Sequence, residues 1–389
     1  MLAWIAPLVV LGLVVFVHEL GHFIAAKLVG VYAPRFSLGW GKPLLRWRRR
    51  GSETEYVISA LPIGGYVRMA SRDDEAASML EGGNEDPKAG AAAGERWDPE
   101  AMMPHGPRPV PADRWFESKH TWQRVFVLLS GVTMNAVLTI GVSTSIFAIY
   151  GRAYVPAVID SVVAGKPAER AGLQKGDSIV AINGVPVRMW NEVLTGVSRS
   201  AGTPLRIDVL RGGAHVAISV TPEEQSAADP VTGKAARVGR IGAGPANKLA
   251  RDPMSLGASV ASGWRATWAM AGSVVGVLGG LLHGTVSVST LGGPIAIART
   301  SVAAARTGME PLLTLIAFLS INLAVLNLLP IPILDGGQIL LTLAEAAKGS
   351  AFSDRTRENF MRVGLAAIAL LFVVVMFNDI KGLVLSIFS

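Results

Sequence analysis

Residues 1–22 read MLAWIAPLVVLGLVVFVHELGH, and this stretch decides the fold because a metal-binding pentapeptide ends an uncharged apolar run. Residues four apart share one face of a helix, so His18 and His22 can offer two imidazoles to one zinc ion while Glu19 reaches a neighbouring water. Buried charges are expensive in hydrocarbon and are kept mainly where they act. A polar helix end that snorkels to the interface is the alternative interpretation. The pattern favours a catalytic zinc site inside a membrane helix.

The composition is that of a membrane protein. Of 389 residues, 50% are hydrophobic and 17% charged, and the mean hydropathy is +0.42, which is too apolar for an ordinary soluble chain. Four blocks approach the length needed to cross about 30 Å of hydrocarbon. We therefore expect four spans, within the segments 1–28, 123–150, 311–337 and 362–388.

Two apolar stretches need separate comment. The first block lacks the basic start and the small-residue cleavage site of a signal peptide, so we expect it to be retained. Residues 268–282 are rich in glycine and only moderately apolar. They could form a partial or interfacial helix within the segment 225–310, and the expected number of full spans stays at four.

Basic residues set the orientation of the blocks. They follow the first block, precede the second and separate the third from the fourth: Arg35, Lys42, Arg46, Arg48, Arg49 and Arg50; Lys119 and Arg124; Lys348, Arg355, Arg357 and Arg362. Because cytoplasmic loops carry the excess of Lys and Arg, we expect these clusters in the cytoplasm and residues 151–310 outside it. These loops account for the net charge of +7, which gives no reason to expect nucleic acid as a partner.

The third zinc ligand must be His, Asp or Glu, because the chain has no cysteine. The best candidate is Asp335, in the segment NLLPIPILDGGQ at 327–338. Its two prolines stop the third helix, and its Gly-Gly pair would let the backbone turn tightly beside the carboxylate. A helix-terminating Asp-Gly turn without metal is the alternative. Because H-E-x-x-H lies at a matching depth, we favour a site of His18, His22 and Asp335 with one position open to water.

The segment 31–70 carries two strand-like runs, RFSLGW and TEYVISALPIGGYVRM, separated by a basic turn. We expect a sheet on the cytoplasmic side that dips toward the metal, with Gly64, Gly65 and Tyr66 in a turn near its edge. A protease must extend a helical substrate before cutting it, and a strand edge stabilises an extended peptide. A small hairpin without substrate contact is the alternative. Residues 71–120 lack hydrophobic periodicity and predict a flexible cytoplasmic linker.

Two asparagines are candidate substrate-binding residues. Asn135 lies inside the second apolar block, where its amide needs a polar partner, either a substrate carbonyl or a neighbouring helix. Asn327 opens the Asp335 segment and could hold substrate or orient that loop.

The segment 153–224 has a different pattern. It alternates strand signals with a short P-A-E-R-A helix, an N-G hairpin signal and a closing hairpin around R-G-G. This order resembles a bacterial PDZ domain. Such a domain can bind an extended C terminus between a strand and a helix, or it can act as a size filter over the membrane site without binding peptide. The sequence leaves both modes open.

Three further stretches complete a family pattern: ALPIGGYVRM at 60–69, SGVTMN at 130–135 and STLGGPIAIA at 289–298. With HELGH in a first membrane helix and NLLPIPILDGG in a later one, most of the chain resembles the site-2 protease family of intramembrane metalloproteases, in its bacterial RseP-type branch. The resemblance implies a multi-span α-helical membrane protein with four transmembrane helices, a membrane-associated β element and one extracytoplasmic PDZ domain (α+β). Many members carry two PDZ copies, whereas this chain has space for one.

The resemblance also implies the chemistry. His18, His22 and Asp335 would be ligands of Zn²⁺, and Glu19 would be the catalytic base. Substrates of the family are single-span membrane proteins, such as anti-sigma factors already trimmed by an upstream site-1 protease, and remnant signal peptides. A multi-pass protein of the bacterial inner membrane is implied, with the active site toward the cytoplasm.

Two rival functions stay open. A catalytically silent membrane receptor could use the PDZ domain to bind peptides, but the intact Glu19 argues against it because a binding scaffold needs no base. A peptidase that clears signal-peptide fragments would use the same site as a signalling protease, so the sequence does not separate these two.

Overall fold

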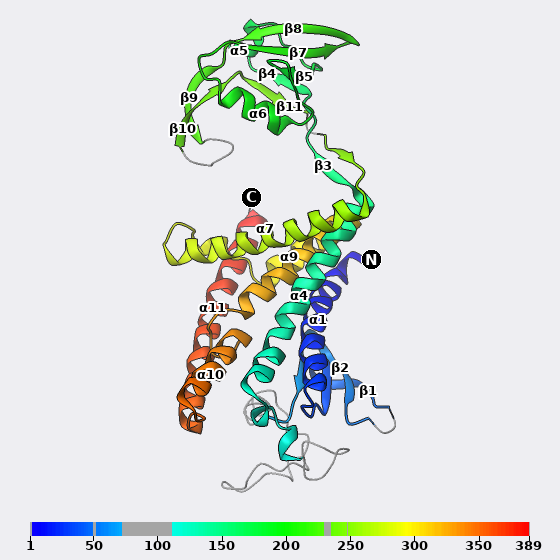
Figure 1. Ribbon diagram of the computed structural model, residues 1–389, viewed down its shortest axis with the longest axis vertical. Coiled ribbons are helices and arrows are strands. Elements are labelled where there is room, and N and C mark those ends of the chain that lie inside the picture. The colour runs from blue at the N-terminus through cyan, green and yellow to red at the C-terminus, as the bar shows by residue number, and fades with distance from the viewer. Residues whose placement is uncertain (1, 50–51, 72–110, 229–234, 247, 389) are drawn as a thin grey trace. The chain divides into compact units, whose positions relative to one another are not determined.

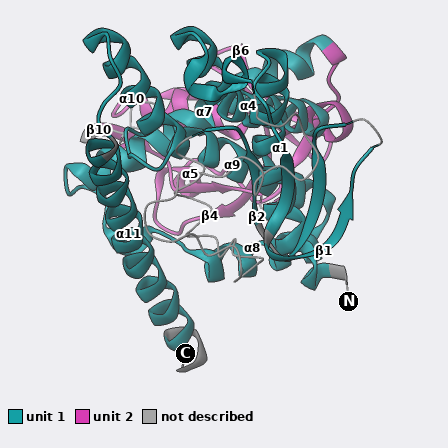
Figure 2. Cartoon of the chain, turned by 90° about the horizontal axis from the view of Figure 1, so that it is seen from below, with its two compact units in different colours: residues 1–146, 257–389 teal, residues 147–256 magenta. Residues whose placement is uncertain are grey.

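A computed structural model of the chain describes residues 2–49, 52–71, 111–228, 235–246 and 248–388. The chain divides into two compact units, shown in two colours in Figure 2. The first unit comprises residues 1–146 and 257–389, and the second comprises residues 147–256. Most of the predicted linker 71–120 lies outside the described residues.

The first unit is built mainly of helices, with one sheet (Figure 1). In the described part of the chain, five helices are long and apolar enough to cross a membrane by length and composition: α1 (Ala6–Leu28), α4 (Thr121–Tyr150), α7 (Leu256–Leu282), α9 (Met309–Asn327) and α11 (Asp354–Phe388). The predicted stretch 268–282 is the second half of α7, which has the lowest hydropathy of the five, 1.3. Figure 1 shows α7 running crosswise to α4. The number of spans therefore stays a prediction.

Shorter helices precede the first of these five or lie between them. They are η1 (Leu2–Trp4), η2 (Ala112–Arg114), η3 (Phe116–Ser118), η4 (Val288–Thr290), α8 (Pro294–Thr307) and α10 (Asp335–Lys348). The carboxylate of Asp379 in α11 accepts hydrogen bonds from the backbone N–H groups of Gly293 and Ile295, at 2.9 and 2.8 Å. It thereby caps the first turn of α8, whose N–H groups have no partner inside the helix.

Small residues bring α1, α4 and α9 close together. A Cβ atom on Gly21 of α1 would lie 2.4 Å from the carbonyl oxygen of Ser130 in α4, so only glycine allows this approach. The hydroxyl of Thr139 in α4 donates to the carbonyl of Ala317 in α9 at 3.2 Å. Membrane helices pack through such small residues and hydrogen bonds because lipid supplies little hydrophobic drive between them.

The strands β1 (Arg35–Trp47) and β2 (Glu55–Arg68) form one sheet beside α1, and they confirm the two predicted strand runs. Both strands bend, so that four strand segments result. Residues 35–38 pair in parallel with 55–58 and antiparallel with 65–68, whereas residues 43–47 pair antiparallel with 56–59. The segment 65–68 therefore forms one edge of the sheet.

Aromatic packing holds this sheet against α1. The ring of Phe36 lies 5.7 Å from that of Phe16 and 5.3 Å from that of Phe23, measured between centroids. The prediction of a turn at residues 64–66 is right only in part. Gly64 has a φ of 84°, which favours glycine, but Gly65 and the residue after it lie within the strand. The bend comes earlier because the segment from 65 pairs with β1.

The segment after α9 differs from the prediction in its glycine pair. Asp335 begins α10, so Gly336 and Gly337 lie inside the first helical turn and make no sharp bend. Their small size has another use. A Cβ atom would lie 2.3 Å from the carbonyl oxygen of Leu328 in the first case and 2.1 Å from that of Ile331 in the second. The preceding loop therefore packs directly onto the start of α10. The last helix also begins earlier than predicted, at residue 354.

The second unit is an α+β fold. Its four-stranded sheet has the order β6-β5-β7-β8, and three two-stranded pairs join β11 to β4, β10 to β9 and β12 to β3. The elements are β3 (Arg152–Tyr154), β4 (Ile159–Val162), α5 (Pro167–Arg170), β5 (Ser178–Ile182), β6 (Val185–Pro186), α6 (Trp190–Ser198), β7 (Leu205–Arg211), β8 (Ala214–Val220), β9 (Glu223–Ala228), β10 (Ala235–Arg240), β11 (Ala243–Pro245) and β12 (Ala250–Asp252).

Both predicted hairpins of this unit are confirmed. Asn183 and Gly184, with φ of 48° and 77°, make the two-residue turn between β5 and β6, and β7 pairs with β8. The unit continues past the predicted boundary at residue 224. Ile241 is buried in the same core as Ile179 and Ile207, so the strands after β8 complete this fold. The PDZ assignment itself stays a prediction.

Candidate metal centre

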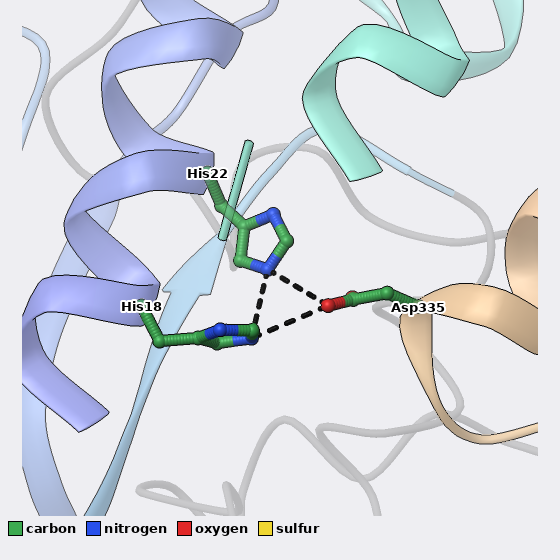
Figure 3. A group of neighbouring side chains, drawn as sticks. All are labelled: His18, His22 and Asp335. Carbon is green, nitrogen blue, oxygen red and sulfur yellow. Dashed lines mark hydrogen bonds and ion pairs between the residues drawn. The ribbon is translucent and has the colours of Figure 1, made fainter. Parts of the chain in front are cut away.

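Two histidines and one aspartate meet between α1 and the start of α10. Figure 3 shows His18 and His22 pointing from α1 toward the carboxylate of Asp335. Their Nε2 atoms are 3.2 Å apart, and one carboxylate oxygen, Oδ2, lies 3.3 Å from the first and 3.4 Å from the second. All three ligand atoms lie within 4.8 Å of one another. This triangle is the donor set of a zinc site that leaves a fourth position open.

The chemistry of these atoms fits a metal ion. Oδ2 of Asp335 is buried and has no directed hydrogen bond among the described residues, although two ring nitrogens face it. Two neutral imidazoles and a carboxylate turned toward one point cannot satisfy one another by hydrogen bonds alone. A divalent cation would accept all three lone pairs, and Zn²⁺ takes N and O ligands in this combination.

Helix α4 supports the two histidines from one face. Nδ1 of His22 lies 2.9 Å from the backbone carbonyl oxygen of Val127, which can only accept, so Nδ1 carries the proton and Nε2 keeps its lone pair. One turn later, a Cβ atom on Gly131 would lie 2.3 Å from Nε2 of His22 and 2.8 Å from Cε1 of His18. The hollow left by glycine therefore accommodates both imidazole rings.

The predicted base lies beside the edge of the sheet. Glu19 is half-buried on α1, and its carboxylate lies beside the backbone of Val67. A Cβ atom on Gly65 would lie 3.3 Å from Cγ of Glu19 and 2.8 Å from the carbonyl oxygen of Ser37. The edge segment 65–68 therefore runs directly beside Glu19. Tyr66, the third predicted residue of this edge, lies in the strand opposite Ser37.

The two predicted asparagines lie on different sides of one ring. Nδ2 of Asn327, at the end of α9, is 3.0 Å from Nε2 of His18. Nδ2 of Asn135, in α4, is 3.4 Å from Nδ1 of the same ring. Because Nε2 also faces His22 and Asp335, Asn327 lies on the side where the ligand atoms converge, and it is partly exposed. Asn135 is completely buried, at 0% exposure.

An ionic cluster holds the far end of α10. The guanidinium groups of Arg124 and Arg357 donate to the two oxygens of Glu345, with Nη2 of Arg124 3.3 Å from Oε2 and Nε of Arg357 3.0 Å from Oε1. Burial alone would raise the pKa of Glu345, but the backbone N–H of Phe352 and these guanidiniums hold it below its usual range. The ionised carboxylate therefore joins α10 to α4 and α11, and so it restrains the helix that begins at Asp335.

Comparison with known proteins identifies the family. The sequence matches peptidase family M50 over residues 6–371. The chain belongs to this family. It is 32% identical over 430 residues to the zinc metalloprotease RasP of Bacillus licheniformis, with 98% of this chain and 99% of that protein covered. It is 31% identical over 394 residues to the metalloprotease MmpA of Caulobacter vibrioides, with 97% and 95% covered. It is 29% identical over 428 residues to the regulator of sigma-W protease RasP of Bacillus subtilis, with 98% and 99% covered.

Membership in family M50 confirms the predicted site-2 protease family, the metalloendopeptidase activity and zinc as the cofactor. The apolar helices and these relatives agree that it is a membrane protein. A proteolytically silent receptor is not supported, because the curated relatives are named as proteases.

Sequence reasoning missed the support from α4. The stretch SGVTMN at 130–135 indicates the family, and the apolar block around Asn135 indicates a polar partner for it, but neither predicts the functions of Gly131 and of the Val127 carbonyl. The spacing held a usable signal, since residues 127, 131 and 135 follow one another at four-residue intervals on one helix face. What the spacing lacks is the identity of the helix that this face meets.

Proposed function

We propose that His18, His22 and Asp335 hold the zinc ion and that Glu19 is the general base of an intramembrane endopeptidase. The convergence of three ligand atoms within 4.8 Å, next to an acid at a sheet edge, carries this proposal. When bound, zinc supplies a Lewis acid that polarises the scissile carbonyl and lowers the pKa of water. Glu19 accepts the proton of the attacking water and returns it to the leaving amine.

The sheet edge extends the substrate. A transmembrane helix hides its amides in its own hydrogen bonds, so the segment to be cut must unwind before a carbonyl can meet a nucleophile. Residues 65–68 form an edge that runs beside Glu19, and an extended peptide can add to such an edge through main-chain hydrogen bonds. Gly64, Gly65 and Tyr66 are the proposed binding residues here. Gly65 lets this edge approach Glu19 closely, because a Cβ atom there would lie 2.8 Å from the carbonyl oxygen of Ser37 and 3.3 Å from Cγ of Glu19.

Asn327 is the proposed polar contact for the substrate near the ligand atoms. Its Nδ2 atom approaches Nε2 of His18 at 3.0 Å from the partly exposed side. When Nε2 gives its lone pair to zinc, this amide loses its acceptor. It can then donate to a substrate carbonyl oxygen in the same place, which would hold the scissile bond in line for attack.

The proposed substrates are single-span membrane proteins, including anti-sigma factors shortened beforehand by a site-1 protease. The name of the Bacillus subtilis relative, a regulator of sigma-W protease, supports this class. Remnant signal peptides are a second class that the same site could take. We further propose an inner-membrane location with the zinc site toward the cytoplasm, since the basic loops flank the inner ends of the helices.

The second unit is the proposed PDZ domain and filter. We propose that it lies outside the cytoplasm and excludes substrates with bulky outer domains, because the charge pattern puts it across the bilayer from Glu19. A filter discriminates by rejecting the wrong partner and needs no groove for peptide.

Zinc content and cleavage together test the site. Purified His22→Ala and Asp335→Ala proteins should lose zinc, and Glu19→Gln should keep zinc but fail to cleave a model single-span substrate. Retention of one zinc per chain in both ligand variants would contradict the ligand assignment. Asp160→Ala, a change of the same type at an exposed position of β4, is the matched control and should behave as wild type.

The filter can be tested by deleting the part of the second unit that lies between strands β3 and β12 in the chain. Strands β3 and β12 pair antiparallel, with Tyr154 opposite Ala250. Residues 155–249 can therefore be replaced by an Asn-Gly turn that keeps this pair. The shortened enzyme should still cleave a trimmed substrate and should also accept one with a folded outer domain. Loss of cleavage of the trimmed substrate in a folded, zinc-loaded protein would instead make the unit a substrate-binding element.

A further inference from the structure

We propose that Asn135 positions the zinc ligand His18 by accepting a hydrogen bond from its Nδ1–H group through the side-chain oxygen Oδ1. The inference rests on the proposed zinc site and adds a residue to it that does not touch substrate. Of the two sequence-based alternatives, it rejects a substrate contact and gives the contact with a neighbouring helix a specific partner, the His18 ring of α1.

The two ring nitrogens of His18 face different partners, one on the metal side and the other toward Asn135. Nε2 faces Nε2 of His22 at 3.2 Å and Oδ2 of Asp335 at 3.3 Å, so this atom belongs to the metal side. Nδ1 faces Asn135. An imidazole that gives the Nε2 lone pair to a metal carries its proton on Nδ1, and this proton needs an acceptor.

The side-chain oxygen Oδ1 of Asn135 could be that acceptor, but the structure places the amide nitrogen Nδ2, and not Oδ1, toward His18. Its Nδ2, a donor, lies 3.4 Å from Nδ1 of His18, whereas its Oδ1 is buried and has no partner among the described residues. The two amide ends have nearly the same shape, and only the hydrogen-bond network distinguishes them. Rotation of the amide by half a turn removes a contact between two donors and gives the orphaned oxygen a partner. The donor–donor contact and the unpartnered oxygen are both removed only if Oδ1 accepts a hydrogen bond from Nδ1–H.

The surroundings of Asn135 restrict its side chain to this task. The residue is 0% exposed. Its backbone oxygen accepts hydrogen bonds from Thr139 and from Ser320 of α9, each at 2.9 Å, so the backbone position is fixed by two helices. A fixed, fully enclosed amide suits a permanent partner in the protein better than a peptide that must enter and leave.

The same face of α4 already provides an oxygen acceptor for Nδ1 of the other histidine, His22. The backbone oxygen of Val127 accepts from Nδ1 of His22 at 2.9 Å. Asn135 lies two turns farther along α4, with Gly131 between them opening space for both rings. Each histidine would thus receive one oxygen from α4 on its Nδ1 side. Such outer partners set the tautomer and the ring orientation of metal-binding histidines, and their loss typically weakens metal affinity 10–100-fold.

The experiment measures zinc affinity of full-length protein in detergent by competition with a chelator. Asn135→Leu, which has no acceptor, should bind zinc about 10–100-fold more weakly than wild type. Asn135→Asp, whose carboxylate can only accept, should bind within a few-fold of wild type. Asn322→Leu is the matched control, because Asn322 donates to the backbone of Phe318 and does not contact His18, so its zinc affinity should be unchanged. Asn135→Ala serves in place of the leucine variant if that protein does not fold.

The outcomes separate this inference from the proposed zinc site. Unchanged zinc affinity in Asn135→Leu, with zinc lost in His22→Ala, would overturn the inference alone. The same would hold if KM rose in both Asn135 variants at wild-type zinc affinity, because the amide would then donate to substrate. Zinc bound by His22→Ala as tightly as by wild type would overturn the ligand assignment and this inference with it. Weak binding by the leucine variant and recovery by Asn135→Asp would establish the acceptor role.

Discussion

Replacing Gly131 by alanine should weaken zinc binding in a protein that still folds. The added Cβ would lie 2.3 Å from Nε2 of His22, the atom proposed to bind the metal. An ordinary contact between carbon and nitrogen needs about 3.5 Å, so the ring must retreat by roughly 1 Å. Metal sites tolerate errors of only about 0.2 Å in ligand distances, and a misplacement of about 1 Å at a catalytic centre can lower the rate about 10²-fold.

The fold should survive because the clashing atom belongs to a side chain. His22 can rotate away from α4 without moving either backbone, and alanine in a helix is favoured over glycine by about 0.5–1 kcal/mol. The prediction is therefore a thermal midpoint close to that of the metal-free wild type, together with zinc affinity reduced at least about 10-fold.

The assay compares two glycines of the same helix. Gly141→Ala makes the same chemical change in α4, but the new Cβ has no heavy atom within 4 Å. Zinc per chain, chelator competition and cleavage of a single-span substrate are measured for both variants and for wild type. Wild-type zinc affinity and activity in Gly131→Ala would refute the reasoning, since the imidazoles would then not depend on the hollow in α4.

Three further predictions concern single carboxylates. Glu19→Gln should lower the rate of cleavage by at least about 10²–10⁴-fold at unchanged zinc content, and activity within a few-fold of wild type would mean that another group is the base. Burial raises the pKa of Glu53, but hydrogen bonds from Arg114 and Lys27 leave it below its ordinary 4.5. Its contribution of about 1–3 kcal/mol is therefore fully present above that pH and is lost as the pH falls through the lower, folded pKa. Thermal melts of Glu53→Gln should accordingly depend less on pH in the acid range below 4.5 than those of wild type, and an equal dependence would contradict the ion pairs. Asp379→Ala should lower the free energy of unfolding in detergent by about 0.5–2 kcal/mol. The loss should be smaller for Asp379→Asn, because the amide oxygen can still cap α8. Equal losses in the two variants would contradict a capping role.

Local rules were sufficient for much of the fold. The uncharged blocks predicted helices that are present as α1, α4, α9 and α11, and alternation predicted the strands β1 and β2. The turn at Asn183 was predictable because a two-residue hairpin needs positive φ at both positions. Boundaries were less accurate. The second unit extends beyond residue 224 because Ile241 completes a core that belongs mainly to earlier strands.

Of the three proposed zinc ligands, two could be paired from the sequence alone, whereas the position of the third is known only from the tertiary structure. The pairing of His18 with His22 follows from helical geometry, because residues four apart face the same way whatever surrounds them. Asp335 could be chosen from sequence only by its chemical type, its helix-ending segment and the family pattern. The structure places its carboxylate oxygen 3.3 Å from His18.

Only the tertiary structure decided what α4 contributes. Asn135 is 117 residues from His18 in the chain, and nothing in its own neighbourhood says which atom it meets. Gly131 is likewise an ordinary helical glycine until α1 brings an imidazole to within 2.3 Å of its missing Cβ. Sequence patterns report the conformation of short segments, because backbone sterics and hydrogen bonds act locally. The support of the histidines depends on contacts between helices that are distant in the chain, and those contacts are made only when the helices pack.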